Sequence, residues 1–220
     1  MPLPIVYRTG GDVQVNYDFA DVVSGTGYIS FYPAASALTG GNVYFLSRDT
    51  EYGSDPVNTD GYTASATYVK VLDFDFDYLL DKPLTLSGDG TINVINSLVS
   101  PSPSGQPAGS RNYSYVVAKI RRWDGVTETD LVTVQGSEFD EDGQTSIRYR
   151  NTGLAFTMPE NRIKKGETIR LTIEVWAKGT TTQTNVDVPH DPSNRTEWAP
   201  SGSGNFPSQM IFKCPLRLDI

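Results

Sequence analysis

The sequence predicts an all-β protein built as an antiparallel β-sandwich. Two observations lead to this fold class: apolar and polar residues alternate with a period of two in several segments, and glycines beside polar residues separate those segments. No segment keeps apolar residues at the i, i+3, i+4 and i+7 spacing of an amphipathic helix, although residues 34–38 are compatible with one short helical turn. About ten short strands with frequent turns are typical of a β-sandwich.

The clearest strands are those in which the alternation marks one buried face. Between residues 68 and 80, Tyr68 and Phe74 share the face expected in the core, and the intervening aspartates share the other. At the C-terminal end Cys214 falls on the apolar face, while Pro215 lacks a backbone N–H and indicates a sheet edge or a bulge. Strong alternation occurs at residues 13–19, 68–80, 169–175 and 210–220, and weaker strands are expected at 27–32, 42–47, 91–98, 113–123, 130–135, 146–150 and 154–158.

Charge and breaker residues divide the chain. Residues 1–100 contain four Lys and Arg against twelve Asp and Glu, whereas residues 101–220 contain fourteen of each kind. The Pro-, Ser- and Gly-rich residues 100–110 at this boundary are a domain linker or a long surface loop, and the loop is favoured because neither half supplies enough strands for a sandwich. Residues 1–64 are interpreted as an extended N-terminal arm or elaborated strands, and residues 65–220 as the sandwich domain.

Composition excludes several function classes. The 220 residues carry a formal net charge of -8 with one His and one Cys, so an internal disulfide and a His/Cys zinc site are excluded. The acidic balance argues against nucleic acid as the main partner. No apolar run approaches the ~20 residues that a membrane span needs, and no leader pattern opens the chain. We therefore expect a protein that binds neither nucleic acid nor membrane and folds in a reducing cytoplasm.

Three carboxylates form the sharpest local pattern. Asp73, Asp75 and Asp77 alternate with phenylalanines, so on a strand they stand on one face about 6.5–7 Å apart. Such a row is one possible cation site, because Ca²⁺ takes several carboxylate oxygens. The glycine and terminal glutamate of a calcium loop are missing, however. A solvated sheet face, or an acidic face that meets a basic neighbour, is therefore the favoured interpretation.

The other candidate residues each favour a structural role. His190 lies between two prolines without a Gly-x-Ser-x-Gly elbow nearby, which indicates a rigid loop rather than a general base. Cys214 is predicted to be a buried thiol. The acidic stretch 139–143 ends in glycine and is predicted to be a surface turn. No catalytic, cofactor-binding or metal-ligating residue is assigned, no cofactor is expected, and an enzyme is not the expected function.

Basic and aromatic residues leave two binding hypotheses open. The basic residues between 121 and 165 could bind nucleic acid together with Trp123, but neighbouring acidic residues cancel their charge. A sheet face of mixed sign, meeting the acidic first part of a second copy, is favoured. Exposed aromatic residues would instead suit a carbohydrate-binding module. The basic residues are Arg121, Arg122, Arg148, Arg150, Arg162, Lys164 and Lys165.

Four stretches together carry a resemblance to a known group of proteins. Residues 119–129 and 164–176, followed by His190-Asp-Pro and the terminal residues 212–220, resemble virion structural proteins of tailed bacteriophages. The second stretch is also similar to the strand entry of jelly-roll trimers, with Glu167 in place of the usual Asp. The resemblance implies a jelly-roll-like sandwich and a capsid-associated role, with residues 1–64 as an arm.

The resemblance leads to an expected function. We expect a capsid decoration (cement) protein that stabilises the head by subunit–subunit contacts, located in the virion and assembled in the host cytoplasm. Its expected partners are the major capsid protein or other virion proteins, and its expected oligomer is a homotrimer. The alternatives are a tail, neck or baseplate structural protein, and a carbohydrate- or receptor-binding module of a tail fibre.

Overall fold

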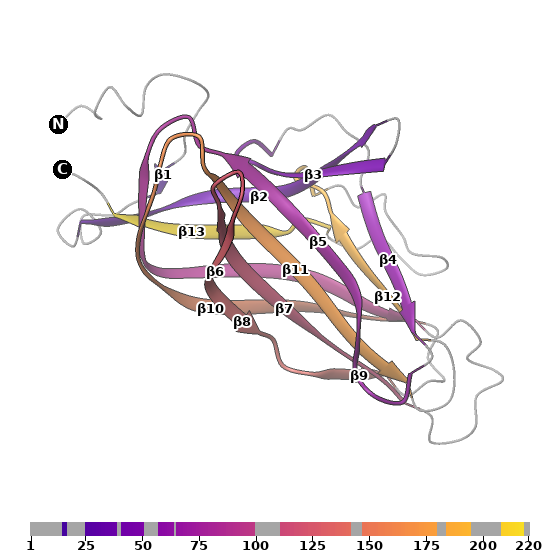
Figure 1. Cartoon of the computed structure of the whole chain (residues 1–220). Coiled ribbons are helices and arrows are strands. Elements are labelled where there is room, and N and C mark those ends of the chain that lie inside the picture. The colour runs from indigo at the N-terminus through magenta and orange to yellow at the C-terminus, as the bar shows by residue number, and fades with distance from the viewer. Residues whose placement is uncertain are drawn as a thin grey trace.

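The chain is an all-β structure, which confirms the predicted fold class. The computed structural model describes residues 15–16, 25–38, 41–50, 57–63, 65–99, 111–141, 147–179, 184–194 and 208–217, and these residues form thirteen strands (Figure 1). None of them belongs to a helix long and apolar enough to cross a membrane. The strands are β1 (Val15–Asn16), β2 (Thr26–Leu38), β3 (Gly41–Ser47), β4 (Val57–Thr63), β5 (Val69–Leu79), β6 (Leu84–Val99), β7 (Asn112–Trp123), β8 (Glu128–Gln135), β9 (Phe139–Glu141), β10 (Ile147–Ile163), β11 (Thr168–Gly179), β12 (Thr184–His190) and β13 (Ile211–Arg217).

The strands form two sheets that are joined through β2. Sheet A contains β1, β4, β6, β10, β12, β13 and the first half of β2, which pairs with β13 up to Phe31. Sheet B contains β3, β5, β7, β8, β9, β11 and the second half of β2, which pairs with β3 from Tyr32 onward. Every described pairing is antiparallel except one parallel bridge between Phe45 of β3 and Asp77 of β5. The predicted antiparallel sandwich is thus the observed architecture.

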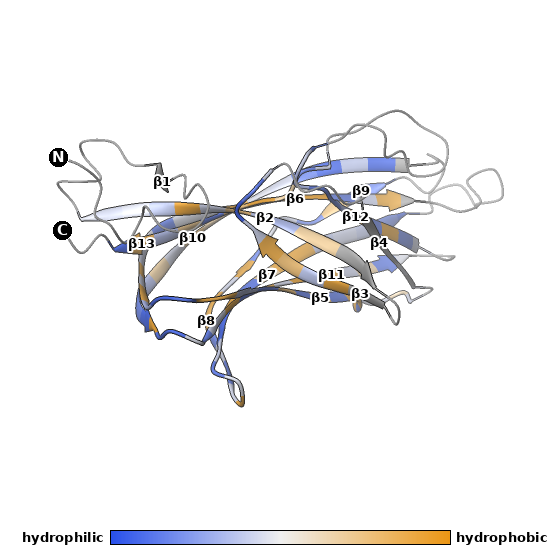
Figure 2. Ribbon diagram, turned by 90° about the horizontal axis from the view of Figure 1, so that it is seen from above, coloured by the Kyte–Doolittle hydropathy of each residue, from blue (hydrophilic) through white to orange (hydrophobic). Residues whose placement is uncertain are grey.

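Apolar side chains from both sheets meet in one core. Leu171, Ile173 and Val175 of β11 are fully buried on the inner face of sheet B, and Phe212 and Ile92 are fully buried on the inner face of sheet A. Burying side chains of this size stabilises the fold by about 1.5–3 kcal/mol each. In Figure 2 the hydrophobic stretches fall along the strands, while the β7–β8 hairpin projects away from the body of the sandwich.

In the middle of sheet A, neighbouring backbone and side-chain atoms lie very close to Gly90 of β6. A Cβ atom at Gly90 of β6 would lie 2.3 Å from Cζ of Phe156 and 2.7 Å from the carbonyl oxygen of Lys213. The register between β13 and β6 shifts between Lys213 and Leu216, so Pro215 lies at an irregularity inside the sheet. Of the two positions predicted for this proline, the bulge is observed and the sheet edge is not, because β13 pairs with both β2 and β6.

Several local predictions are corrected by strand pairing. Residues 34–38, predicted as a helical turn, continue β2 because they pair with β3. Residues 147–150 and 154–158, which come from the two separately predicted strands 146–150 and 154–158, belong to the single strand β10, which pairs with β6 on both sides of a register shift between Met158 and Asn161. The predicted rigid loop around His190 is instead the end of β12.

Strands between residues 26 and 63 contribute to both sheets. β4 forms within a stretch that has few aliphatic residues, because it pairs along its whole length with β12. The division of the chain at residue 64 stays a prediction, although β2, β3 and β4 are members of the sheets. The predicted loop at 100–110 and most of the predicted strand at 13–19 lie outside the described residues.

Candidate functional site

Charged side chains cross the outer face of sheet B in rows set by strand register. In the first row Asp77 of β5, Arg170 of β11, Arg121 of β7 and Asp130 of β8 stand opposite one another. In the second row Asp75, Thr172 and Lys119 do the same, and in the third Asp73 lies opposite Glu174. We call this surface the charge ladder, and it consists of Lys70, Asp73, Asp75, Asp77, Lys119, Arg121, Glu128, Asp130, Arg170, Thr172 and Glu174.

Arg170 is the centre of the first row. Its Nε and Nη2 atoms donate to the two carboxylate oxygens of Asp77 at 2.7 and 2.8 Å, and its Nη1 donates to Glu128 at 2.9 Å. This bidentate geometry is the strong form of a carboxylate–guanidinium pair. The hydrogen bond to Asp77 is the main reason that the pKa of Arg170 is raised. Glu128 also binds Nη1 of Arg121 at 2.8 Å, so one carboxylate joins the two guanidinium groups.

Glu174 is the buried carboxylate of the ladder, with only 5% of its surface exposed. Lys119 donates to its Oε1 at 2.6 Å, and the indole N–H of Trp176 donates to its Oε2 at 3.0 Å. Burial by itself would raise the pKa of Glu174. The hydrogen bonds from Lys119 and Trp176, with the charges of Lys119 and Lys70, outweigh burial and lower this pKa. The carboxylate is therefore held in its charged form.

The three aspartates singled out in the sequence are bound by groups of the same chain. Asp73 pairs with Lys70, Asp75 accepts from the hydroxyl of Thr172, and Asp77 is held by Arg170. Of the two interpretations, an acidic face that meets a basic neighbour matches this geometry. Among the described residues no group of three or more His, Cys, Asp or Glu side chains is arranged to hold a metal ion.

An aromatic cluster continues the outer face beyond the ladder. The rings of Tyr115 and Trp176, on β7 and β11, are nearly parallel with centroids 6.2 Å apart, and Tyr68 lies 4.8 Å from Tyr115. The ammonium of Lys178 stands 4.4 Å from the ring centre of Tyr68 and 4.5 Å from that of Tyr113. These distances are typical of cation–π contacts. All five side chains are partly exposed.

A bulge in β5 places Tyr68 in this cluster. The register between β5 and β11 shifts beyond Leu72, which leaves Val71 without a partner on β11. One extra residue reverses the alternation, so Tyr68 lies on the outer face and not on the predicted core face. Burial and a hydrogen bond to Glu138 raise the pKa of the Tyr68 hydroxyl. The sequence pattern missed the cluster because nothing local marks the bulge.

His190 is a core residue between the two sheets. It is 1% exposed, and its ring lies 5.3–5.8 Å from those of Tyr44, Phe74 and Phe76. Nδ1 lies 3.1 Å from the carbonyl oxygen of Val188, which requires that Nδ1 carry the proton. Burial lowers the pKa of His190 to about 4, so the ring is neutral at pH 7. This environment suits a structural residue.

A buried polar network lies between the ends of β7, β9 and β12. The amide nitrogen of Asn112 donates to Glu141 at 2.9 Å, and the hydroxyl of Thr184 donates to the amide oxygen of Asn112 at 2.8 Å. Ser97 donates to Asp187 at 3.0 Å. Glu141 is fully buried and belongs to strand β9, so the surface turn predicted at 139–143 is wrong for residues 139–141. Pairing with β7 draws this acidic segment into the sheet.

The remaining predicted residues are dispersed. Cys214 is 1% exposed, and burial raises the pKa of its thiol, as expected for a core residue.

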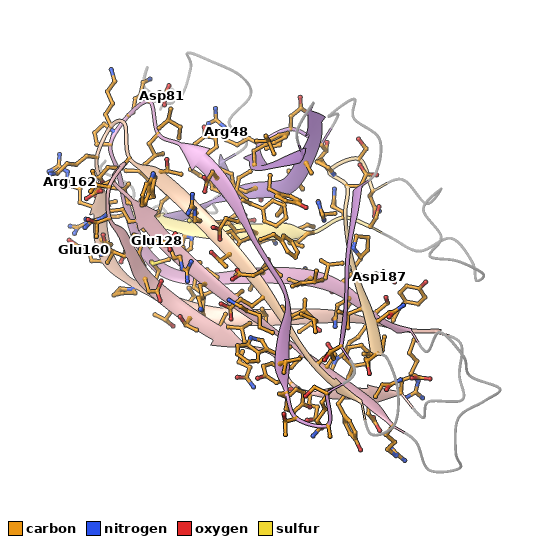
Figure 3. The ribbon with its side chains drawn as sticks, turned by 45° about the vertical axis from the view of Figure 1, so that its right-hand side comes forward. Arg48, Asp81, Glu128, Glu160, Arg162 and Asp187 are labelled. Atoms are coloured by element: carbon orange, nitrogen blue, oxygen red, sulfur yellow. The ribbon has the colours of Figure 1, made fainter. Side chains whose placement is uncertain are left out.

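The basic residues do not form one patch. Arg121 lies in the charge ladder, while Arg148 and Arg150 donate to the backbone oxygens of Asp140 and Glu138, each at 2.9 Å. These two arginines link sheet A to sheet B. Figure 3 places Glu128, Glu160 and Arg162 toward one end of the sandwich and Asp187 toward the other.

Comparisons with known proteins bear on the fold only. No family model and no curated protein matches the chain. An aminopeptidase from a marine sediment Thaumarchaeota archaeon aligns at a TM-score of 0.50 and 10% identity, over 88% of this chain and 37% of that one. A CocE/NonD family hydrolase from Staphylococcus aureus aligns at 0.38 and 10%, over 84% and 41%. A pentameric capsid protein from metagenomic phage sequences aligns at 0.17 and 16%, over 54% and 64%.

The chain spans about two fifths of the length of the first two of these proteins. The likeness to the aminopeptidase is a likeness of β-sandwich architecture at 10% identity. Viral capsid proteins are among the weak structural neighbours.

Proposed function

We propose that this chain is a non-enzymatic structural protein of a virion, and specifically a capsid decoration (cement) protein that stabilises the head by subunit–subunit contacts. The observation that carries this proposal is the charge ladder. Its carboxylates are bound by cations of the same chain, so the face is rigid and preformed and offers no free acid–base pair for chemistry. Such a face suits docking against a neighbouring protein.

The sequence resemblance to phage virion proteins falls on the strands that build this face. Residues 119–129 include the second half of β7 and the start of β8, and residues 164–176 include most of β11. The two stretches contribute Lys119, Arg121, Glu128 and Arg170 to the ladder. The residues that carry this resemblance therefore include charged members of the ladder on the outer face of sheet B.

The proposed mechanism is repeated weak contact. Copies of the chain, assembled as a homotrimer, bridge neighbouring subunits of the major capsid protein, and each contact is modest. Contacts repeated over a lattice give high avidity because the later binding steps are effectively intramolecular. Complementary charges at such contacts fix orientation and register more than they add affinity.

The test is binding of the full chain to capsids. We expect the protein to co-sediment with emptied, expanded heads and to appear on their exterior by cryo-electron microscopy. The charge-reversal variant Asp130→Lys alters an exposed ladder residue and is expected to weaken binding, whereas Asp89→Lys on the outer face of sheet A serves as the matched control. Density at the tail, neck or baseplate would instead establish the alternative location.

The aromatic cluster supports a second candidate, a carbohydrate- or receptor-binding module. Sugar rings stack on aromatic side chains, and Tyr115 and Trp176 present partly exposed rings beside the polar groups of Glu138 and Lys178. A glycan array with the full chain tests this function. Trp176→Ala should abolish any glycan signal and Trp123→Ala, at the other end of the sheet, should preserve it. Absence of any glycan signal would exclude this second function for the glycans tested.

A further inference from the structure

The aromatic cluster occupies a compact area on the outer face of sheet B. Trp176 of β11 stands opposite Tyr115 of β7, and Lys178 of β11 stands opposite Tyr113 of β7. The two positions on each strand are about 7 Å apart, and the two strands are about 4.8 Å apart. Tyr68 of β5 reaches the same area, because its ring centroid lies 4.8 Å from that of Tyr115. The cluster therefore offers an area that matches a short stretch of glycan.

Contacts inside the cluster hold its side chains in place. The indole N–H of Trp176 donates to Oε2 of Glu174 at 3.0 Å, which fixes the orientation of the indole ring. The hydroxyl of Tyr68 donates to Glu138, and burial together with this hydrogen bond raises the pKa of Tyr68, so the hydroxyl keeps its proton at pH 7. Aromatic side chains that are already fixed lose little conformational freedom on binding. The rings are therefore preorganised to stack against an apolar ligand face.

The charges beside the rings are balanced. The ammonium of Lys178 lies 4.0 Å from Oε2 of Glu138, and the ammonium of Lys119 binds Oε1 of Glu174 at 2.6 Å. A ligand carboxylate bound by Lys178 would stand beside the carboxylate of Glu138, and a ligand ammonium bound by Glu138 would stand beside Lys178. Like charges at such short distances repel, so the cluster disfavours both acidic and basic sugars. Two further ion pairs next to the cluster are Lys70–Asp73 and Arg111–Asp140.

We propose that the aromatic cluster binds a neutral β-linked glycan whose sugar rings carry equatorial hydroxyls. The axial C–H groups of one such ring form an apolar face that stacks on Trp176 and Tyr115. A hydroxyl at the edge of the ring accepts from Lys178 and donates to Glu138. A hydroxyl has one proton and two lone pairs, so it satisfies both charged groups without adding a charge. This inference rests on the second candidate function and names the ligand class for its site.

Three oligosaccharides with the same backbone test the ligand class. Cellotetraose is neutral, its uronate counterpart carries carboxylates, and the chitosan tetramer carries ammonium groups, while all three share the β-linkage and the equatorial substituents. Isothermal titration calorimetry of the full chain at pH 6 and low salt should show cellotetraose binding at least about fivefold more tightly than either charged sugar. Equal or tighter binding of a charged sugar, or no binding of cellotetraose, would overturn the proposal.

Removing one member of the Lys178–Glu138 pair should switch the preference between sugars. Glu138→Gln keeps an oxygen that accepts from Tyr68 but removes the negative charge, so the uronate tetramer should bind about fivefold more tightly. Lys178→Met removes the positive charge and should favour the chitosan tetramer by a similar factor. Glu160→Gln removes an exposed carboxylate that pairs with Arg217 in sheet A, and as the matched control it should change none of the affinities. Unchanged affinities in Glu138→Gln would overturn the role given to this pair.

Failure of the ligand class and failure of the second candidate function give different results. Signals from charged glycans alone on the glycan array would overturn the neutral ligand class and retain the function. Cellotetraose binding that survives Trp176→Ala would overturn the site, because stacking on this ring would then contribute nothing. Absence of every glycan signal would overturn both the ligand class and the function for the glycans tested. Urea unfolding of each variant checks that the fold is retained.

Discussion

The outer faces of the two sheets differ in side-chain chemistry. On sheet B, Arg170 and Lys119 bind carboxylates from neighbouring strands, and the rows of charge cover the buried Glu174. On sheet A, the centre of β6 and β10 carries small uncharged side chains such as Thr91 and Ala155. The charged side chains on the outer face of sheet B are therefore bound by groups of the same chain, whereas the centre of β6 and β10 in sheet A carries little charge.

The two sheets also gain stability in different ways. Sheet B depends on charges that stand opposite each other across strands, and such pairs are partly exposed and therefore screened by water. Sheet A depends on close packing against backbone, as where Phe156 lies over Gly90. Substitutions in sheet A should consequently act through steric fit, and substitutions in sheet B should act through unpaired charge.

The largest expected effect concerns Gly90. Gly90→Ala would push a Cβ into Phe156 and the oxygen of Lys213, and we expect it to lower the free energy of unfolding by about 3 kcal/mol. Gly153→Ala on the adjacent strand is the matched control, because its Cβ has room, and it should change stability by less than about 0.5 kcal/mol. Urea unfolding at pH 7 measures both. Equal effects of the two substitutions would refute the steric account of sheet A.

The second expected effect is on the pH dependence of stability, and it comes from His190, which lies where the two sheets meet. Its neutral form is favoured in the folded state, where the pKa is about 4, against 6.5 in the unfolded chain. The stability that depends on His190 is full above pH 6.5 and is lost as the pH falls from 6.5 to 4, by about 3 kcal/mol. His190→Gln, which does not titrate, should remove this part of the pH dependence. Parallel stability profiles for the two proteins between pH 4 and 6.5 would contradict this assignment.

The smallest of the three effects concerns Arg170 in sheet B. Arg170→Met leaves Asp75, Asp77 and Glu128 without their shared cation, and we expect a loss of about 2 kcal/mol. Asp77→Asn in the same chain should recover part of this loss by removing one uncompensated charge. Arg162→Met, at an exposed position of β10, is the control. Failure of Asp77→Asn to recover any stability would show that the loss comes from packing and not from charge.

Much of the fold could be predicted from local alternation. The buried faces of β11 and β13 follow directly from the period of two, and Cys214 lies in the core as its place in that pattern predicts. The aspartates of β5 lie on one outer face for the same reason, except that alternation alone does not identify their partners. Those partners, Arg170 and Thr172, lie more than 90 residues further along the chain.

The features that the sequence pattern did not predict depend on pairing between distant strands. Residues 34–38 and 57–63 become strands because β3 and β12 supply partners, although the first segment is compatible with a helical turn and the second has few aliphatic residues. The aromatic cluster around Trp176 is missed because the bulge at Val71 reverses the face of Tyr68. A bulge is set by the partner strand, so local periodicity does not reveal it.

Residue types and their alternation established the strand class, the core faces of the strongly alternating segments and the scarcity of His and Cys. These properties depend on residue type and on a period of two, which are local. Strand pairing in the folded chain established which charges meet and where Tyr68 and His190 lie. Those properties depend on strand order and register, which are set by contacts between residues far apart in the chain.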